Sequence, residues 1–96
     1  MSVFFIGQGI IKDRIAFVEY STGTLATFAP FGGAMIARGL RSHELLGARG
    51  ADITIIVRFP DMASVEAWYA SDAYQALIPV RERALDLKIT VFNEPV

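Results

Sequence analysis

Arg38 and His43 are the residues of this chain whose side chains could most directly take part in catalysis. Arg38 lies in the apolar segment GAMIARGL, where a guanidinium could hold a carboxylate or an enolate through paired hydrogen bonds. His43 follows in a polar loop segment, and histidine is the side chain that exchanges a proton most readily near neutral pH. Together they predict proton transfer in which the arginine stabilises anionic charge.

Both residues also have an interpretation without catalysis. A guanidinium buried in an apolar strand requires a partner, because an unpaired buried charge is strongly unfavourable. Glu19, Glu44 and Glu66 could provide that partner as an internal ion pair with Arg38. His43 could be an ordinary exposed loop residue.

Four aromatic residues could line a ligand pocket, with their hydroxyl and indole groups fixing the ligand. They are Tyr20, Trp68, Tyr69 and Tyr74. For Trp68 and Tyr74 a place in the core or in a dimer contact is the favoured interpretation, because aromatic residues at helical spacing usually pack inside. We expect a ligand site formed by Tyr20, Arg38, Trp68 and Tyr69.

Several other kinds of chemistry are disfavoured by composition. The chain has no cysteine and one histidine, which excludes thiolate or histidine-rich metal sites and a thiol nucleophile. Gly7-Gln8-Gly9 lies within a predicted strand, and Gly32-Gly33 joins a helix end to a strand, so neither resembles a phosphate-binding loop. We expect no metal and no cofactor.

Charge and hydropathy indicate the partners and the location. Nine basic and ten acidic residues are scattered without a block and give a net charge of −1, which argues against nucleic acid. The first apolar run is interrupted by glycine and has no basic residue before it, so it is a poor signal peptide and too short to cross a bilayer. With 96 residues, 53% of them hydrophobic, we expect one cytoplasmic domain spanning residues 1–96.

The elements that must position these residues follow from periodicity and from caps. Alternation and β-branched residues predict strands over residues 3–11, 34–40, 52–59 and 88–93. Helical spacing after a cap at Asp13 predicts a first helix that Pro30 and the following glycines stop. Asp61 predicts a helix over 62–70, Ser71 caps a second segment that Pro79 breaks, and a short helix resumes over 81–87.

The order β-α-β-β-α-β predicts an α+β ferredoxin-like plait, in which a four-stranded antiparallel sheet carries both helices on one face. Strand parity then assigns two faces. Facing the helices should be Ile53, Ile55, Val57, Phe59, Ile89 and Val91; facing away should be Thr54, Ile56, Arg58, Thr90 and Phe92. Because Ile56 and Phe92 would otherwise meet water, we expect a homodimer formed through this second face.

The segment from residue 59 to 84 resembles the domain-of-unknown-function 1330 family. The resemblance rests on Phe59-Pro60, Trp68-Tyr69, Ser71, Tyr74-Gln75-Ala76-Leu77 and Arg81, with Tyr20, Gly32-Gly33 and Arg38-Gly39 upstream. Leu46 stands where the family often has an acidic residue. The resemblance implies the dimeric α+β barrel fold, whose members include cofactor-free monooxygenases, haem-degrading enzymes and small-ring isomerases.

Two functions remain open at this stage. The first is a homodimer that binds a small, partly apolar carboxylate or carbonyl compound, with cofactor-free proton transfer or oxygenase chemistry. The second is a non-catalytic dimeric binding or structural module, in which Arg38 forms an ion pair and the aromatic residues belong to the core.

Overall fold

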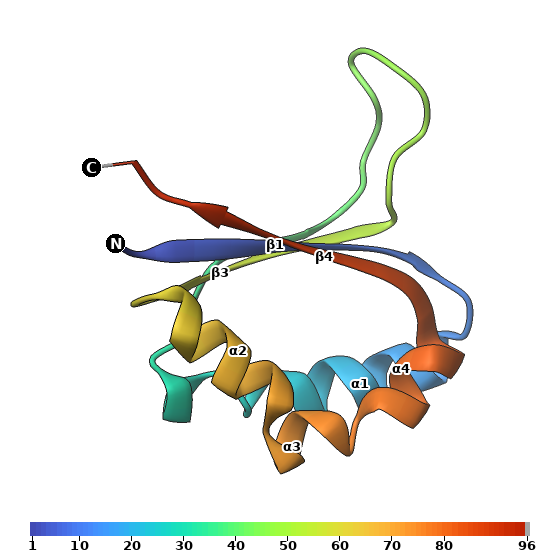
Figure 1. Ribbon diagram of the computed structural model, residues 1–96. Helices are drawn as coiled ribbons and strands as arrows, with labels where there is room; N and C mark the ends of the chain where they lie inside the picture. The colour runs from blue at the N-terminus through green and yellow to red at the C-terminus, as the bar shows by residue number, and fades with distance from the viewer. Residues whose placement is uncertain (96) are drawn as a thin grey trace.

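The computed structural model describes residues 1–95 and contains a single four-stranded sheet with helices on one side (Figure 1). The strands are ordered β2-β3-β1-β4 and every neighbouring pair is antiparallel, which is the predicted ferredoxin-like arrangement. The elements in chain order are β1 (Val3–Ile11), α1 (Arg14–Leu25), the 3₁₀-helix η1 (Ala29–Phe31), β2 (Ala34–Leu40), β3 (Ile53–Phe59), α2 (Met62–Ala70), α3 (Asp72–Gln75), α4 (Ile78–Ala84) and β4 (Leu85–Asn93).

Side-chain caps start the helices where the sequence predicts. Asp13 accepts a hydrogen bond from the backbone N–H of Ala16 at 3.0 Å, and Asp61 does the same for Ser64 at 2.8 Å. The first helix nevertheless ends at Leu25, before the expected stop at Pro30. The Thr24 carbonyl accepts from both the N–H and the hydroxyl of Thr27, at 2.9 and 2.6 Å, and these bonds turn the chain out of the helix.

The prediction for the last helix and strand is wrong in its boundaries. Pro79 lies in the first turn of α4, where its missing N–H has no helical partner to lose, so it begins this helix and does not break it. The helix ends at Ala84, and β4 starts at Leu85, three residues earlier than expected. Leu85 pairs with Ile11 and is 3% exposed, so its burial in the core explains the early start of the strand.

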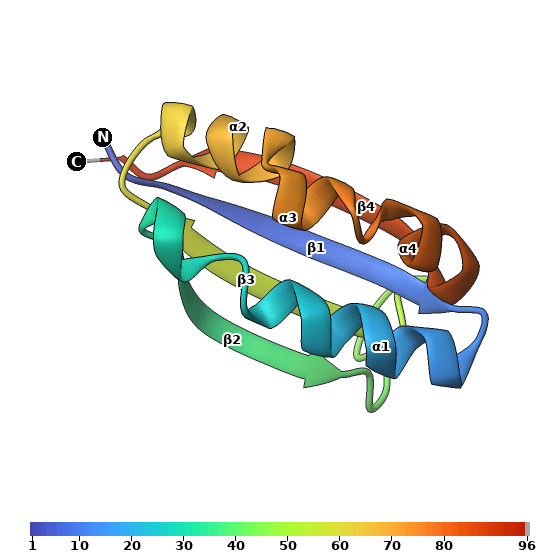
Figure 2. The same ribbon diagram turned by 90° about the horizontal axis from the view of Figure 1, so that it is seen from below.

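The core lies between the sheet and the helices, two layers that are seen edge-on in Figure 1 and with the helices in front of the sheet in Figure 2. Its largest fully buried side chains are Trp68, Tyr74, Phe59, Val3 and Val57. Phe5 of β1 stacks on Trp68 of α2 with ring centroids 5.2 Å apart. The predicted inner face of the sheet is therefore confirmed, because Ile53, Val57 and Phe59 are buried in this core.

The opposite face of the sheet carries apolar residues that the chain itself does not cover. The register pairs Ile6 with Ile56 and Phe4 with Phe92, and the two phenylalanine rings stack with centroids 5.5 Å apart. Phe92 remains 43% exposed. The predicted outward orientation of Ile56 and Phe92 is thus confirmed by the register.

The segment joining β2 to β3, residues 41–52, projects from the sheet on the side away from the helices (Figure 1). Leu45 and Leu46 lie in this loop and are each 94% exposed. Two apolar side chains in water on a projecting loop are unusual for a protein that acts alone. In residues 1–95, no helix is long and apolar enough to cross a membrane.

Candidate functional site

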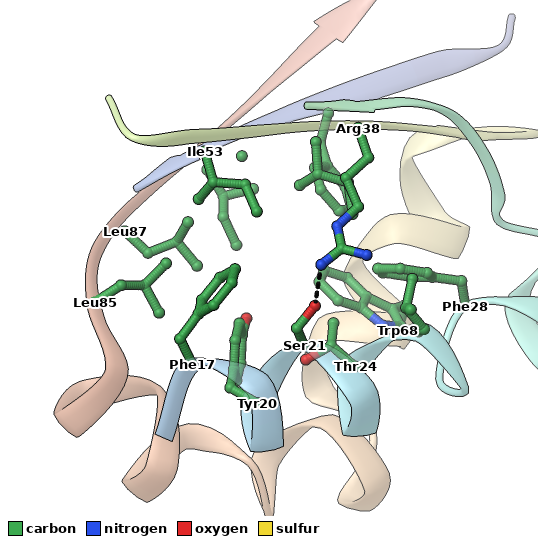
Figure 3. A pocket seen from close by; sticks show the side chains of 15 residues that line it. Phe17, Tyr20, Ser21, Thr24, Phe28, Arg38, Ile53, Trp68, Leu85 and Leu87 are labelled. Atoms are coloured by element: carbon green, nitrogen blue, oxygen red, sulfur yellow. Dashed lines mark hydrogen bonds between the residues drawn. The ribbon is translucent and has the colours of Figure 1, made fainter. Parts of the chain in front are cut away.

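A cavity lies between the inner face of the sheet and helix α1 (Figure 3). About 520 Å³ of space not filled by atoms lies in the cavity and at its mouth, and part of this space is open solvent. Most of its wall is apolar and includes Phe5, Phe28, Trp68, Leu87 and Ile89. Its polar lining residues are Tyr20, Ser21, Thr24 and Arg38. An apolar chamber with a few polar groups is the usual form of a small-molecule site.

Arg38 reaches this cavity because β2 contains a β-bulge. Met35 pairs with Val57 and Ala37 pairs with Ile56, so Ile36 is an extra residue in the strand. The insertion shifts the alternation and places Arg38 opposite Ile55, on the face that carries the helices. If Ile36 were paired in regular alternation after Met35, Arg38 would lie opposite Thr54 and point to the other face.

The Arg38 guanidinium is exposed at the cavity and is held by one hydrogen bond, 2.8 Å long, from Nη2 to Ser21 Oγ (Figure 3). The expectation that it is buried is wrong, because β2 is an edge strand and every residue of it is exposed. Within residues 1–95, no carboxylate lies within ion-pairing distance of Arg38. Its charge is therefore available to a ligand.

The three glutamates considered as partners for Arg38 lie elsewhere. Glu19 approaches Arg83 at 3.8 Å, and Glu44 accepts a hydrogen bond from the backbone of Gly50 at 2.9 Å. Glu66 lines a separate groove. An internal ion pair therefore does not explain why an arginine occupies position 38.

Tyr20 is 7% exposed, and its hydroxyl lies 2.8 Å from that of Tyr74, which is fully buried. Arg81 donates from Nη1 to the Tyr74 oxygen at 3.1 Å. Burial, followed by the neighbouring Tyr74 hydroxyl, raises the pKa of Tyr20 well above its ordinary value. Tyr20 is therefore a neutral hydrogen-bonding group at physiological pH.

Trp68 forms part of the cavity wall, but its polar group is already used. The indole Nε1 donates to Thr27 Oγ1 at 2.9 Å, and that hydroxyl donates in turn to the Thr24 carbonyl at 2.6 Å. Trp68 is 1% exposed. Its contribution to the cavity is therefore an apolar surface, and its N–H holds α2 to the end of α1.

Thr24 is a site residue that sequence reasoning missed. Its side chain lines the cavity and the residue is 7% exposed, yet its hydroxyl oxygen makes no hydrogen bond of good geometry within the described residues. A buried hydroxyl without a partner is destabilising by about 1–3 kcal/mol. A threonine inside an amphipathic helix gives no sequence signal for this property, which depends on the cavity beside it.

Tyr69 lies outside this cavity. It lines an open groove on the far side of Trp68, together with Glu66, Arg81 and the inner residues of β4. Its hydroxyl accepts a hydrogen bond from Arg81 Nη1 at 3.2 Å. The predicted ligand residues therefore divide: Tyr20, Arg38 and Trp68 meet in one cavity, and Tyr69 faces another surface.

His43 also lies apart from the cavity. It is exposed in the loop of residues 41–52, where Nδ1 lies 3.0 Å from the hydroxyl of Ser42. The cavity wall contains no histidine, aspartate or glutamate. Within one subunit the predicted general base is thus not brought to Arg38, and its catalytic role stays a prediction. The described residues also hold no cluster of three or more histidine, cysteine or acidic side chains that could bind a metal ion.

The geometry supports binding of a compound with an apolar body and an anionic or strongly polar oxygen. Aromatic and aliphatic side chains would surround the body, and Arg38 would meet the oxygen at the open side. The lack of an acid or base in the wall means that the cavity alone offers charge stabilisation and not a proton acceptor.

Solved structures with this fold include proteins of unknown function and one oxygenase. RPA0582 from Rhodopseudomonas palustris, a protein of unknown function, has a TM-score of 0.85 at 16% identity, covering 99% of this chain and 83% of its own. SnoaB from Streptomyces nogalater, a cofactor-independent oxygenase, has a TM-score of 0.74 at 14% identity, covering 99% and 94%. A dimeric ferredoxin-like protein of unknown function from Jannaschia sp. CCS1 has a TM-score of 0.74 at 10% identity, covering 98% and 100%.

At these identities the solved structures establish the fold alone. No curated protein matches the chain. The family model for the domain of unknown function DUF1330 matches residues 2–95, nearly the whole sequence, in agreement with the residues that carry the resemblance. The chain therefore belongs to the DUF1330 family.

Proposed function

We propose that this protein binds a small, partly apolar carboxylate or carbonyl compound in the cavity between the sheet and α1. The observation that carries the proposal is the position of Arg38, a cation without an acidic partner at an otherwise apolar cavity. A guanidinium matches the two oxygens of a carboxylate or the charge of an enolate. Tyr20 and Trp68 supply the remaining contacts.

The binding unit that we propose is a homodimer formed through the open sheet face. Ile6, Ile56, Phe4 and Phe92 form an apolar patch on this face. A second copy of the sheet would cover the patch, and the loop of residues 41–52 projects on the same side. The dimeric ferredoxin-like proteins among the solved structures support this assembly.

Proton-transfer or oxygenase chemistry without a cofactor is the catalytic form of the proposal. Arg38 could stabilise the negative charge that forms when a carbon next to a carbonyl loses its proton. SnoaB, a cofactor-independent oxygenase with the same fold, supports this class of reaction. Because the wall contains no acid or base, binding has more support from the geometry than catalysis has. The lack of cysteine remains the basis for expecting a cytoplasmic protein.

The alternative is a non-catalytic dimeric binding or structural module. The core positions of Trp68 and Tyr74 fit that alternative equally well, because both are buried whether or not a ligand is present. Arg38 favours the ligand-binding proposal, because a neutral hydroxyl and not a carboxylate holds its guanidinium at the cavity.

A thermal-shift screen of aryl and alkyl carboxylates tests the proposal on wild type and Arg38→Ala. A ligand at a hundred times its dissociation constant should stabilise the wild type by about 2.7 kcal/mol. Arg41→Ala is the matched control, because Arg41 is a nearby exposed arginine that does not line the cavity. Equal shifts in wild type and Arg38→Ala would contradict the proposed site.

A further inference from the structure

The hydrogen bonds around Tyr74 fix the direction in which its proton points. A guanidinium can only donate, so Arg81 Nη1 donates to the Tyr74 oxygen over 3.1 Å. Tyr74 is 0% exposed, which leaves no water to receive its own proton. Within residues 1–95, the Tyr20 oxygen, 2.8 Å away, is the acceptor within reach of that proton. Tyr74 therefore donates to Tyr20.

It follows that, within residues 1–95, the proton of Tyr20 has no acceptor in good hydrogen-bond geometry. With its oxygen accepting from Tyr74, the Tyr20 hydroxyl has a free O–H on a side chain that lines the cavity. The chain of donors from Arg81 through Tyr74 polarises this O–H, because each donated bond makes the next donor stronger. Burial raises the pKa of Tyr20, which keeps the proton in place.

Thr24 places a second unused hydroxyl beside the first. Residues 20 and 24 are four apart on α1 and so are neighbours on one helix face, and both side chains line the cavity (Figure 3). Thr24 is 7% exposed, and its hydroxyl oxygen makes no hydrogen bond of good geometry within the described residues, although it lies next to the Tyr20 hydroxyl. Two hydroxyl groups in one apolar cavity thus lack an acceptor. Together they can donate hydrogen bonds to an oxygen atom of a ligand.

We infer that the hydroxyls of Tyr20 and Thr24 form a second polar subsite, which binds a neutral carbonyl oxygen of the ligand. This inference rests on the proposed function, and it narrows the ligand to an apolar compound that carries a ketone or enol oxygen in addition to the anionic group at Arg38. Tyr74 and Arg81 are positioning residues, because they do not contact the ligand and act on it only by orienting the Tyr20 hydroxyl.

Two matched probes separate this subsite from the Arg38 site. β-Benzoylpropionate carries a carboxylate and a ketone, and γ-phenylbutyrate has the same skeleton without the ketone. Calorimetric titration of both into wild type should give about fivefold tighter binding of the ketone, the ratio expected for one net hydrogen bond. Tyr20→Phe and Thr24→Val should reduce that ratio towards one. Thr22→Val and Tyr69→Phe, which alter hydroxyls outside the cavity, should retain it.

The variants distinguish failure of the inference from failure of the proposed function. Arg38→Ala should weaken both probes by the same factor; no weakening of either probe would overturn the proposed function, and the subsite with it. Two results would overturn the subsite alone while binding still depends on Arg38. In the first, the wild type shows no preference for the ketone; in the second, the preference persists in Tyr20→Phe and Thr24→Val.

Two further measurements do not depend on affinity. The infrared carbonyl stretch of bound β-benzoylpropionate should lie at lower frequency in wild type than in Tyr20→Phe, with Tyr74→Phe between them. If the carbonyl stretching frequency in Tyr74→Phe equalled that in wild type, the positioning role of Tyr74 and Arg81 would be contradicted. Thr24→Val should melt at or above the wild-type temperature, and a clear drop would overturn the assignment of its hydroxyl as unpartnered.

Discussion

Arg38 on β2 and Ser21 on α1 are joined by a hydrogen bond of 2.8 Å that crosses the cavity between sheet and helix. This bond connects an exposed cation to a single neutral hydroxyl. The arginine is therefore oriented towards the cavity without being neutralised, which distinguishes it from an arginine kept for stability.

Arg38→Ala should change the free energy of unfolding by about 1 kcal/mol or less, because it removes one exposed hydrogen bond and no ion pair. Urea denaturation of the ligand-free protein measures the change. Removing one partner of a buried ion pair typically costs about 3–5 kcal/mol. A loss of that size would assign Arg38 a structural role.

Ile56→Asp should shift the protein from dimer towards monomer or unfold it. The substitution places a charge at the centre of the open sheet face, where burial of an isoleucine is worth about 1.5–3 kcal/mol. Sedimentation velocity at micromolar concentration measures the mass. Ile15→Asp is the control, because Ile15 is 85% exposed on α1, on the other side of the sheet. A monomeric wild type would contradict the proposed dimer.

Thr27→Val should destabilise the protein by about 1–3 kcal/mol, because it leaves the buried indole N–H of Trp68 without an acceptor. Thr24→Val, the same substitution three residues earlier, should not destabilise the protein, because the Thr24 hydroxyl makes no hydrogen bond of good geometry. Chemical denaturation followed by tryptophan fluorescence compares the two variants, and equal losses would contradict the hydrogen-bond assignment.

Gly33→Ala should destabilise by about 1–3 kcal/mol through overpacking. A methyl group there would lie 2.8 Å from the ring of Phe59, which is fully buried, and 3.0 Å from Cβ of Phe28. Gly39→Ala on β2 is the comparison, since a methyl group at that position meets no atom within 4 Å. Thermal melting of both variants should show the loss in Gly33→Ala alone.

Stability should fall as the pH rises above about 10, the ordinary pKa of a tyrosine hydroxyl. Burial, followed by the adjacent Tyr74 hydroxyl, raises the pKa of Tyr20 in the folded chain, so the unfolded chain releases a proton that the folded chain retains. The stability is fully present below that pH and is lost above it. Urea denaturation from pH 8 to 11 should show a weaker dependence in Tyr20→Phe than in Tyr69→Phe.

Most of the fold follows from local patterns in the sequence. The bounds of β1, β2 and α2 and the two faces of β3 agree with alternation, turn residues and caps, because each of these signals acts over a few residues. The last strand starts early because Leu85 pairs with Ile11, which is distant in sequence, and the first helix ends early because Thr27 bonds the Thr24 carbonyl. Neither interaction leaves a periodic signal in the sequence.

The site was predictable only in part. Arg38, Tyr20 and Trp68 stand out by residue type, and the fold brings them to one cavity. The direction of Tyr69 depends on the packing of α2, which turns Trp68 inwards and the adjacent tyrosine towards another groove. The role of Thr24 depends on its hydroxyl having no hydrogen-bond partner of good geometry, and this can be seen only in the three-dimensional structure.

The extra residue in β2 has a consequence for how this site could change in evolution. Arg38 lies opposite Ile55 because Ile36 is left unpaired, so a slip of the strand that paired Ile36 with Ile56 would place Arg38 opposite Thr54 and turn it from the ligand cavity to the opposite sheet surface. A change of pairing register could thus create or abolish a charged binding pocket while every side chain is retained. Related chains with the same arginine could differ in function through the presence or absence of this bulge alone.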